Sequence, residues 1–270
     1  MNNKHQRPIG IFDSGIGGLT VAHAIKTLLP DEDIIYFGDT AHLPYGDKSE
    51  AAIQVYSIKI ADILLKKGCK VIVIACNSAS SASYELLKEY VRTDTHIINV
   101  IDPMVALVTH QFQGCNVGLI GTKRTVQSGV YARKIEEADR NITLHSLATP
   151  LLAPMIEEGF FNNQISHEII AQYLSDASIG NVEALILACT HYPLIKKEIS
   201  QYYGGEMTIL DSSEVIAKAL QAYLAKEQLL NTAHAVTHHF LVSDFTESFE
   251  SAARMFFHES VKLEKHSLWN

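Results

Sequence analysis

The stretch Lys70-Val71-Ile72-Val73-Ile74-Ala75-Cys76-Asn77-Ser78-Ala79-Ser80 is an apolar run that ends in a cysteine and continues with small polar residues. A second stretch, Ala184-Leu185-Ile186-Leu187-Ala188-Cys189-Thr190-His191-Tyr192-Pro193, repeats this plan. Continuous Val/Ile/Leu runs are typical of strands buried on both faces in parallel sheets. Each cysteine then falls at a strand end, where open α/β sheets bind ligands. The repeat predicts one site flanked by two thiols, Cys76 and Cys189; two separate buried core cysteines are the alternative.

The composition is that of an ordinary globular protein. The chain has 270 residues, of which 47% are hydrophobic and 19% are charged. Its net charge of −8 argues against a surface for nucleic acid or anionic membranes. No apolar run reaches the length of a membrane span, and residues 1–8 lack the apolar segment of a signal peptide. We therefore expect a cytoplasmic protein with no nucleic-acid or membrane partner.

The chain has few cysteines, and no two form a C-x-x-C pair. Neither a disulfide framework nor a zinc site is expected. The 13 histidines are scattered, so we expect no metal. Cys69 and Cys115 are assigned to packing.

Strand and helix patterns alternate along the chain, and the alternation restarts after residue 101. This order predicts an α/β fold with mainly parallel sheets. The expected strands are 8–12, 33–39, 70–75, 96–101, 116–121, 143–148, 184–188, 207–210 and 235–242. The expected helices are 19–29 with Asp13 or Ser14 as cap, 49–67, 80–91, 126–137, 166–174, 194–203, 215–225, and a last one through 249–257 capped by Asp244 with Glu247.

The two cysteine segments suggest acid–base chemistry at a carbon atom. A thiolate is favoured beside a helix amino terminus, so we expect at least one of these thiols to have a pKa below the ordinary value of about 8.5. Neighbouring hydroxyl, amide and backbone N–H groups suit a substrate carboxylate. One thiol would remove a proton and the other would return one to the opposite face, as in a racemase or epimerase.

Two other functions fit part of the pattern. In a hydrolase or amidotransferase, Cys189 would be the nucleophile and His191 its base. That interpretation leaves Cys76 and the repeat unexplained. A two-lobed protein that only binds a small molecule would have no use for exposed thiols.

Four motifs together resemble glutamate racemase, of the cofactor-independent aspartate/glutamate racemase family. They are Phe12-Asp13-Ser14-Gly15-Ile16-Gly17-Gly18, Pro44-Tyr45-Gly46, Ala75-Cys76-Asn77-Ser78-Ala79 and Cys189-Thr190-His191-Tyr192-Pro193. They occur in the family's order, and the match covers essentially the whole chain. Aspartate racemases usually carry Glu after the second Cys-Thr, so His191 favours glutamate over aspartate. Ser78 replaces the Thr of many members and keeps the hydroxyl.

The resemblance implies two pseudo-symmetric α/β domains with the active site in the cleft between them. The chain is expected to return to the first domain near Asp211, which gives domains of 1–100 plus 210–270 and of 101–209. It also implies that the enzyme supplies D-glutamate for peptidoglycan and needs no cofactor. We further expect a homodimer that acts on the small-molecule substrate glutamate.

Residue roles carry over from the family motifs. Cys76 would remove the proton from D-glutamate and Cys189 from L-glutamate, with Asp13 supporting Cys76 and His191 supporting Cys189. Glu157 loosely matches a further catalytic motif, and the alternative for it is a charge exposed to solvent. The alternative for Asp13 is a helix cap. The implied substrate contacts are Asp13, Ser14, Tyr45, Gly46, Asn77, Ser78, Thr190 and His191, with Thr122 and Thr125 as further candidates.

Overall fold

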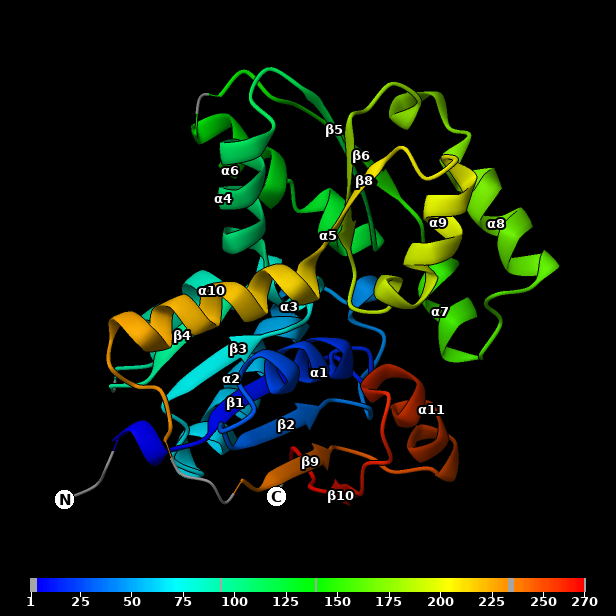
Figure 1. The fold of residues 1–270 in the computed structure, drawn as a ribbon. Coiled ribbons are helices and arrows are strands. Elements are labelled where there is room, and N and C mark those ends of the chain that lie inside the picture. Colours follow the sequence, from blue (N-terminus) through cyan, green and yellow to red (C-terminus); the bar gives the residue numbers. More distant parts are fainter. Residues whose placement is uncertain (1–3, 93, 139, 233–235, 270) are drawn as a thin grey trace.

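A computed structural model describes residues 4–92, 94–138, 140–232 and 236–269 of the chain. Two parallel sheets, each flanked by helices, form its two bodies (Figure 1). The strands are β1 Ile9–Asp13, β2 Ile34–Gly38, β3 Val71–Ile74, β4 His96–Asn99, β5 Asn116–Gly121, β6 Thr143–Ala148, β7 Ala184–Ala188, β8 Thr208–Asp211, β9 His238–Val242 and β10 Leu263–Lys265.

The helices alternate with these strands over most of the chain. They are α1 Leu19–Leu28, α2 Glu50–Lys66, α3 Asn77–Tyr90, α4 Ile101–Gln111, α5 Lys123–Gln127, α6 Val130–Glu137, α7 Leu152–Glu157, α8 Gln164–Leu174, α9 Lys196–Tyr202, α10 Ser212–Lys226 and α11 Glu247–Phe257. Short 3₁₀ turns are η1 Lys4–Gln6, η2 Tyr45–Asp47, η3 Ala177–Ile179 and η4 Tyr192–Ile195.

The two sheets repeat one strand order. The first runs β10-β9-β2-β1-β3-β4 and the second β6-β5-β7-β8, and the strand pairs are parallel in both. Within each half of the chain the order is therefore second, first, third, fourth. Each cysteine follows the third strand of its half, β3 or β7. The predicted α/β fold with two pseudo-symmetric parallel sheets is confirmed.

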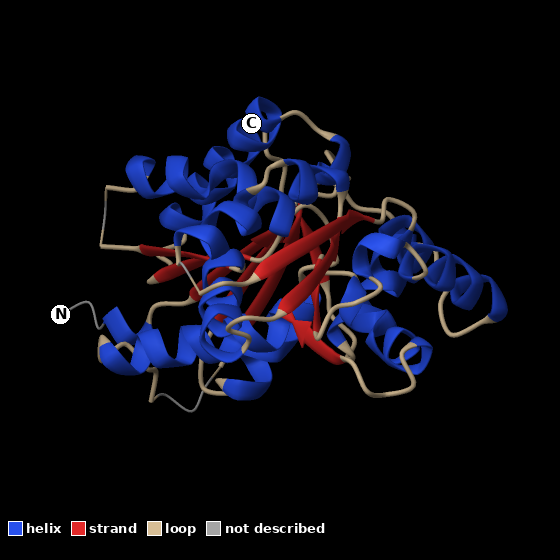
Figure 2. Ribbon diagram, turned by 90° about the horizontal axis from the view of Figure 1, so that it is seen from above, coloured by secondary structure: helices blue, strands red, loops and turns tan. Residues whose placement is uncertain are grey.

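The cysteine strands are buried on both faces, and in the view from above helices surround the strands (Figure 2). Along β3, Val71 and Val73 pack in the core cluster that includes α1. Ile72 and Ile74 point to the opposite face and pack with residues of α2 and α3. This two-residue period explains why the run is apolar throughout.

The chain passes between the two bodies more than once. Helix α10 begins where β8 of the second sheet ends, and it packs against α1 beside the first sheet (Figure 1). Strands β9 and β10 then extend the first sheet next to β2. None of the helices in the described part of the chain has the length and apolar character of a membrane span.

Several expected boundaries were wrong. Residues 101–111 form α4, because Pro103 lies in a first turn, where its missing N–H is not needed. The helix expected at 126–137 is divided into α5 and α6 at Gly129, whose φ is +62°. Gly18 is the N-cap of α1 and Thr246 that of α11, in place of the capping residues expected there. Strand β10 was not expected.

Candidate active site

A cavity of about 230 Å³ lies where the carboxyl ends of strands from the two sheets meet. In each sheet the strand order reverses beside the first strand of the half, and ligands bind at such switch points. Most of the expected site residues line this one cavity: Ser14, Tyr45, Gly46, Cys76, Asn77, Ser78, Thr122, Glu157, Cys189, Thr190 and His191. Asp13 and Thr125 are buried and do not line it.

Cys76 is the N-cap of α3, and this helix begins three residues earlier than expected. Its sulfur accepts a hydrogen bond from the backbone N–H of Ala79 and donates its own proton to Ser14 Oγ at 3.7 Å. Burial, together with the charge of Asp13, nevertheless raises the pKa of the thiol to about 12. For Cys76 the loss of solvent outweighs one helix-end donor, and the expectation that at least one of the two thiols is acidic stays a prediction.

Cys189 follows β7 and lies beside the imidazole of His191. The Cys189 sulfur is 3.6 Å from His191 Nδ1, and the Glu157 carboxylate is 2.7 Å from His191 Nε2. Burial alone would lower the pKa of His191, but the hydrogen bonds to Cys189 and Glu157 raise it well above its usual range. With an acceptor at each nitrogen, the ring is an imidazolium that donates to both. Glu157 thus lines the cavity and contacts His191; its catalytic role stays a prediction.

Asp13 lies under the cavity and connects the two sheets. Its carboxylate accepts from the backbone N–H of Gly15 and, at 3.4 Å, from the hydroxyl of Thr190. Thr20 of α1 donates to the carbonyl oxygen of Thr190 at 2.9 Å. Burial raises the pKa of Asp13, against the opposing charge of His191. Asp13 therefore acts on Cys76 through its charge and holds the segment after Cys189.

Gly17 allows the close contact between these segments. A Cβ atom at this position would lie 2.6 Å from His191 Nδ1 and 2.7 Å from Thr190 Oγ1. Any larger residue would displace the side chains next to Cys189. The glycine is needed here for close approach and not for a special backbone angle.

A cluster of hydroxyl groups joins α3 to α5. Ser78 Oγ is 2.8 Å from Thr122 Oγ1 and 3.4 Å from Thr125 Oγ1. Thr122 also caps α5 by accepting from the backbone N–H of Thr125. Thr125 therefore lies behind the two hydroxyl groups that line the cavity.

The loop that carries Tyr45 and Gly46 is fixed by a residue that the sequence analysis missed. Asp39, which is fully buried, accepts from Tyr45 OH at 2.6 Å, from Ser243 Oγ at 2.7 Å and from His42 Nδ1 at 2.8 Å. Its position at the end of an apolar strand, Ile34 to Gly38, was the signal that could have revealed it. Five apolar residues also form the cavity wall, and none of them was expected as a substrate contact: Leu43, Pro44, Ala153, Pro154 and Ala188.

The two remaining cysteines differ from each other. Cys69 is fully buried, and burial raises its pKa to about 12, in agreement with a packing role. Cys115 is only half-buried, and its sulfur lies near the carbonyl oxygen of Gln113, so the packing assignment holds less well.

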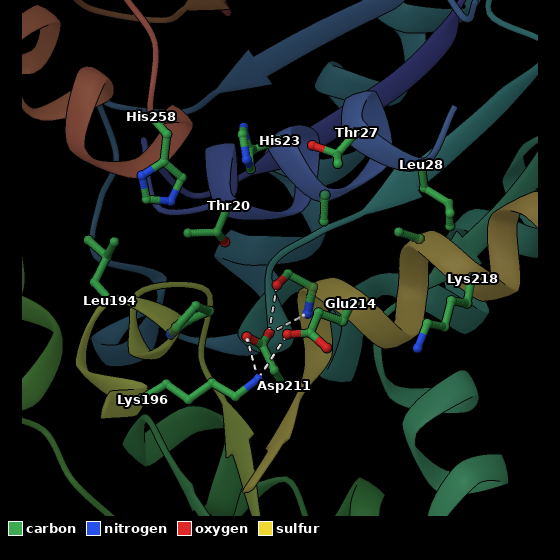
Figure 3. A pocket seen from close by; sticks show the side chains of 14 residues that line it. Thr20, His23, Thr27, Leu28, Leu194, Lys196, Asp211, Glu214, Lys218 and His258 are labelled. Atoms are coloured by element: carbon green, nitrogen blue, oxygen red, sulfur yellow. Dashed lines mark hydrogen bonds and ion pairs between the residues drawn. The ribbon is translucent and has the colours of Figure 1, made fainter. Parts of the chain in front are cut away.

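A larger cavity of about 550 Å³ lies between α1, η4 and α10 (Figure 3). Thr20 lines it, and neither Cys76 nor Cys189 does. Lys196 in its wall makes ion pairs with Asp211 and Glu214. Across the described residues, no group of three or more His, Cys, Asp or Glu side chains is placed to hold a metal ion.

Comparison with known proteins identifies the family of this chain. The sequence pattern of the Asp/Glu/hydantoin racemases matches residues 19–220. A glutamate racemase of Chlorobaculum parvum is 38% identical over 250 residues, 92% of each chain. One of Geobacter metallireducens is 39% identical over 244 residues, 90% of each chain. The crystal structure of glutamate racemase from Francisella tularensis in complex with D-glutamate has a TM-score of 0.92 at 39% identity, covering 98% of this chain and 99% of that one. This chain therefore belongs to the Asp/Glu/hydantoin racemase family and is an amino-acid racemase.

Proposed function

We propose that the chain interconverts L- and D-glutamate by a two-base mechanism in which Cys76 and Cys189 are the acid and the base. One observation carries the proposal: both sulfurs line a single cavity, and each comes from the third strand of a different sheet. This placement suits proton transfer at two faces of one α-carbon. A single base would have to reach around that carbon.

The surroundings of the two sulfurs differ, and this difference determines which sulfur starts as the acid and which as the base. The raised pKa keeps Cys76 a thiol, which is a proton donor. Cys189 Sγ lies 3.6 Å from Nδ1 of the His191 imidazolium, and we assign it the role of the base that acts on L-glutamate. With L-glutamate, Cys189 takes the α-proton, the electron pair stays on the α-carbon as a carbanion, and Cys76 gives its proton to the opposite face. With D-glutamate the roles reverse, after the proton has moved to Cys189.

Glutamate is the substrate best supported by the relatives. The curated relatives described above are glutamate racemases, and the Francisella tularensis enzyme was crystallised with D-glutamate. The aspartate racemase of Picrophilus torridus, at 22% identity and a TM-score of 0.58, shares the fold alone. Ser78, Thr122 and Asn77 offer hydroxyl and amide groups to the two carboxylates of such a substrate. Of the substrate contacts expected from the sequence, we retain those residues that line the cavity, which excludes Asp13 and Thr125.

The cellular role and the assembly are part of the same proposal. D-glutamate made here would enter peptidoglycan synthesis, and the protein would act as a homodimer. The domain limits at residues 101 and 210 also remain a prediction. They are supported by β8, which ends the second sheet at Asp211, and by β9, which returns to the first.

The test follows optical activity with purified protein and L-glutamate, L-aspartate or L-glutamine. Glutamate alone should racemise. In deuterated water, new D-glutamate should carry deuterium at the α-carbon while unreacted L-glutamate stays protonated early on. Cys76→Ala and Cys189→Ala should each abolish racemisation, and Cys69→Ala and Cys115→Ala should leave it nearly intact.

Three results would contradict the proposal. Early deuterium in unreacted substrate would indicate a single base. Racemisation by either active-site variant would remove that cysteine from the mechanism. Ammonia release from glutamine would favour a hydrolase, for which the contact between Cys189 and His191 is the supporting observation.

A further inference from the structure

A tyrosine from the second body of the fold contacts a cavity residue from the first. Tyr131 of α6 donates from its hydroxyl to Asn77 Oδ1, the side-chain carbonyl of the first residue of α3, at 2.8 Å. Tyr131 is 3% exposed and Asn77 is 2% exposed, so water cannot replace this bond easily. Tyr131 does not line the cavity, whereas Asn77 does.

The bond leaves one polar group of Asn77 without a partner. Asn77 Nδ2 is buried and makes no hydrogen bond to any described residue. A buried N–H₂ group without an acceptor is unfavourable, and each such group calls for an explanation. A substrate carboxylate in the adjoining cavity would supply the acceptor.

The alternative orientation of the amide would do the opposite. An asparagine side chain turned by 180° would direct its carbonyl oxygen toward the substrate and repel a carboxylate. The two orientations have nearly the same shape, so packing alone does not select between them. The hydroxyl of Tyr131 is the donor that favours the first, since burial raises the pKa of Tyr131 above its ordinary value and keeps the proton on it.

We propose that Tyr131 is a positioning residue, which fixes the amide of Asn77 so that its N–H₂ group binds a substrate carboxylate. The inference rests on the proposed glutamate racemase function. It goes beyond that function because it assigns a role to a side chain outside the cavity. It also makes recognition of the carboxylate depend on contact between α3 and α6, which flank different sheets.

The test replaces Tyr131 by phenylalanine, which keeps the ring and removes the hydroxyl. Loss of one hydrogen bond to a substrate-binding group should raise the KM for glutamate about tenfold. The kcat should stay within about twofold, because binding and not proton transfer is weakened. Tyr203→Phe is the matched control, since its buried hydroxyl has no partner among the described residues and Tyr203 does not line the cavity. Its KM should not change.

A double-mutant cycle separates positioning from a general structural role. If Tyr131 acts through Asn77, adding Tyr131→Phe to Asn77→Ala should not raise the KM further. An equal rise in both backgrounds would overturn the inference. Asn77→Asp is a second variant that leaves Tyr131 in place; it puts a carboxylate oxygen where the N–H₂ group was, so its KM should rise more than that of Tyr131→Phe. An unchanged KM in Asn77→Asp would also overturn the inference.

Failure of this inference is distinguishable from failure of the proposed function. Wild-type protein that racemises glutamate, with an unchanged KM in Tyr131→Phe, overturns the inference alone. Wild-type protein that does not racemise glutamate overturns the proposed function. Calorimetric titration of glutamate into wild type and Tyr131→Phe then still measures the contribution of the amide, and equal affinities, or no binding to either, would overturn the inference as well.

Discussion

His191 Nε2 lies 2.7 Å from Glu157 Oε1, and the opposite nitrogen of the same ring lies 3.6 Å from Cys189 Sγ. A carboxylate in the cavity wall is thereby connected to a thiol through one buried imidazolium. Because each ring nitrogen donates, the protonation of His191 controls the charge beside Cys189. Glu157 comes from α7, and Cys189 from the loop after β7.

Replacing Glu157 by glutamine should shift the pH dependence of racemisation. Without the carboxylate, the pKa of His191 falls from its raised value, so the imidazolium is lost at lower pH. The high-pH limb of the kcat/KM profile should move to lower pH. Both directions should change by the same factor, since the enantiomers have equal free energies. Circular dichroism assays from pH 6 to 11 measure the two profiles. Glu158→Gln, at the exposed neighbouring residue, is the control. Coincident profiles for wild type and Glu157→Gln would contradict the prediction.

The same pair should make folding stability depend on pH. His191 has a higher pKa in the folded state than the unfolded value of about 6.5, so its contribution is complete below that value. It is lost as pH rises through the folded-state pKa. Urea denaturation of the wild type should therefore show a decline in the free energy of unfolding at high pH that is smaller in Glu157→Gln. An identical decline in both proteins would exclude this pair as its source.

Replacing Asp13 by asparagine should make Cys76 more reactive while it impairs catalysis. Burial is the main cause of the raised Cys76 pKa and persists in the variant, but the charge of Asp13 is removed. The pKa should fall, and iodoacetamide should label Cys76 faster at pH 9, as followed by mass spectrometry. Cys69, whose pKa is also raised to about 12 by burial, is the internal reference and should not change. Slower labelling of Cys76 would show that Asp13 stabilises its thiolate.

Replacing Gly17 by alanine should remove activity and leave the fold largely intact. The added Cβ would occupy space held by His191 and Thr190, so the imidazole must move away from Cys189. We expect a loss in kcat of at least about a hundredfold, as for other small displacements of catalytic groups. Thermal unfolding should change by only a few degrees. Gly180→Ala is the matched control, because Gly180 is exposed, has a φ of −71° and would place its added Cβ no closer than 3.6 Å to another residue. Retained activity in Gly17→Ala would contradict the account.

A buried ion pair far from the cavity should govern stability alone. Lys70 Nζ donates to Glu32 at 2.5 Å and to the carbonyl oxygens of His5 and Leu229. Lys70→Met would leave the Glu32 carboxylate buried without its cation, which destabilises by about 3–5 kcal/mol. The double variant with Glu32→Gln should recover part of this loss. Denaturant titration measures both, kcat should stay near wild type, and equal stability of the two variants would contradict the role of the charge.

The sequence predicted those parts of the fold that depend on local patterns. The runs that end at Cys76 and Cys189 are apolar because both faces are covered, so they were recognisable without a partner strand. Helix α4 was missed because Pro103 reads as a helix stop unless the helix is known to begin two residues earlier. Strand β10 has three residues and owes its existence to β9, which no local pattern shows.

The site was predictable where a motif places a side chain at a strand end. Cys76 and Cys189 were found in this way, because their positions in the chain decide their positions in space, whereas the apolar residues of the cavity wall were not. The pKa of Cys76 was not predictable, because it depends on burial by other segments of the chain and on the charge of Asp13. Asp39 and Tyr131 were missed for the same reason: each acts through a partner that is distant in sequence, Ser243 or Asn77.

The hydrogen bond from Ser243 to Asp39 has a consequence for the folding of the enzyme during its synthesis. Ser243 follows β9, and it holds the carboxylate that also anchors Tyr45 in the cavity wall. During translation, both cysteines leave the ribosome well before residue 243 does. A nascent chain can therefore carry both thiols while the wall around Tyr45 still lacks its anchor. The segment around Ser243 must therefore be in place before the cavity wall is complete.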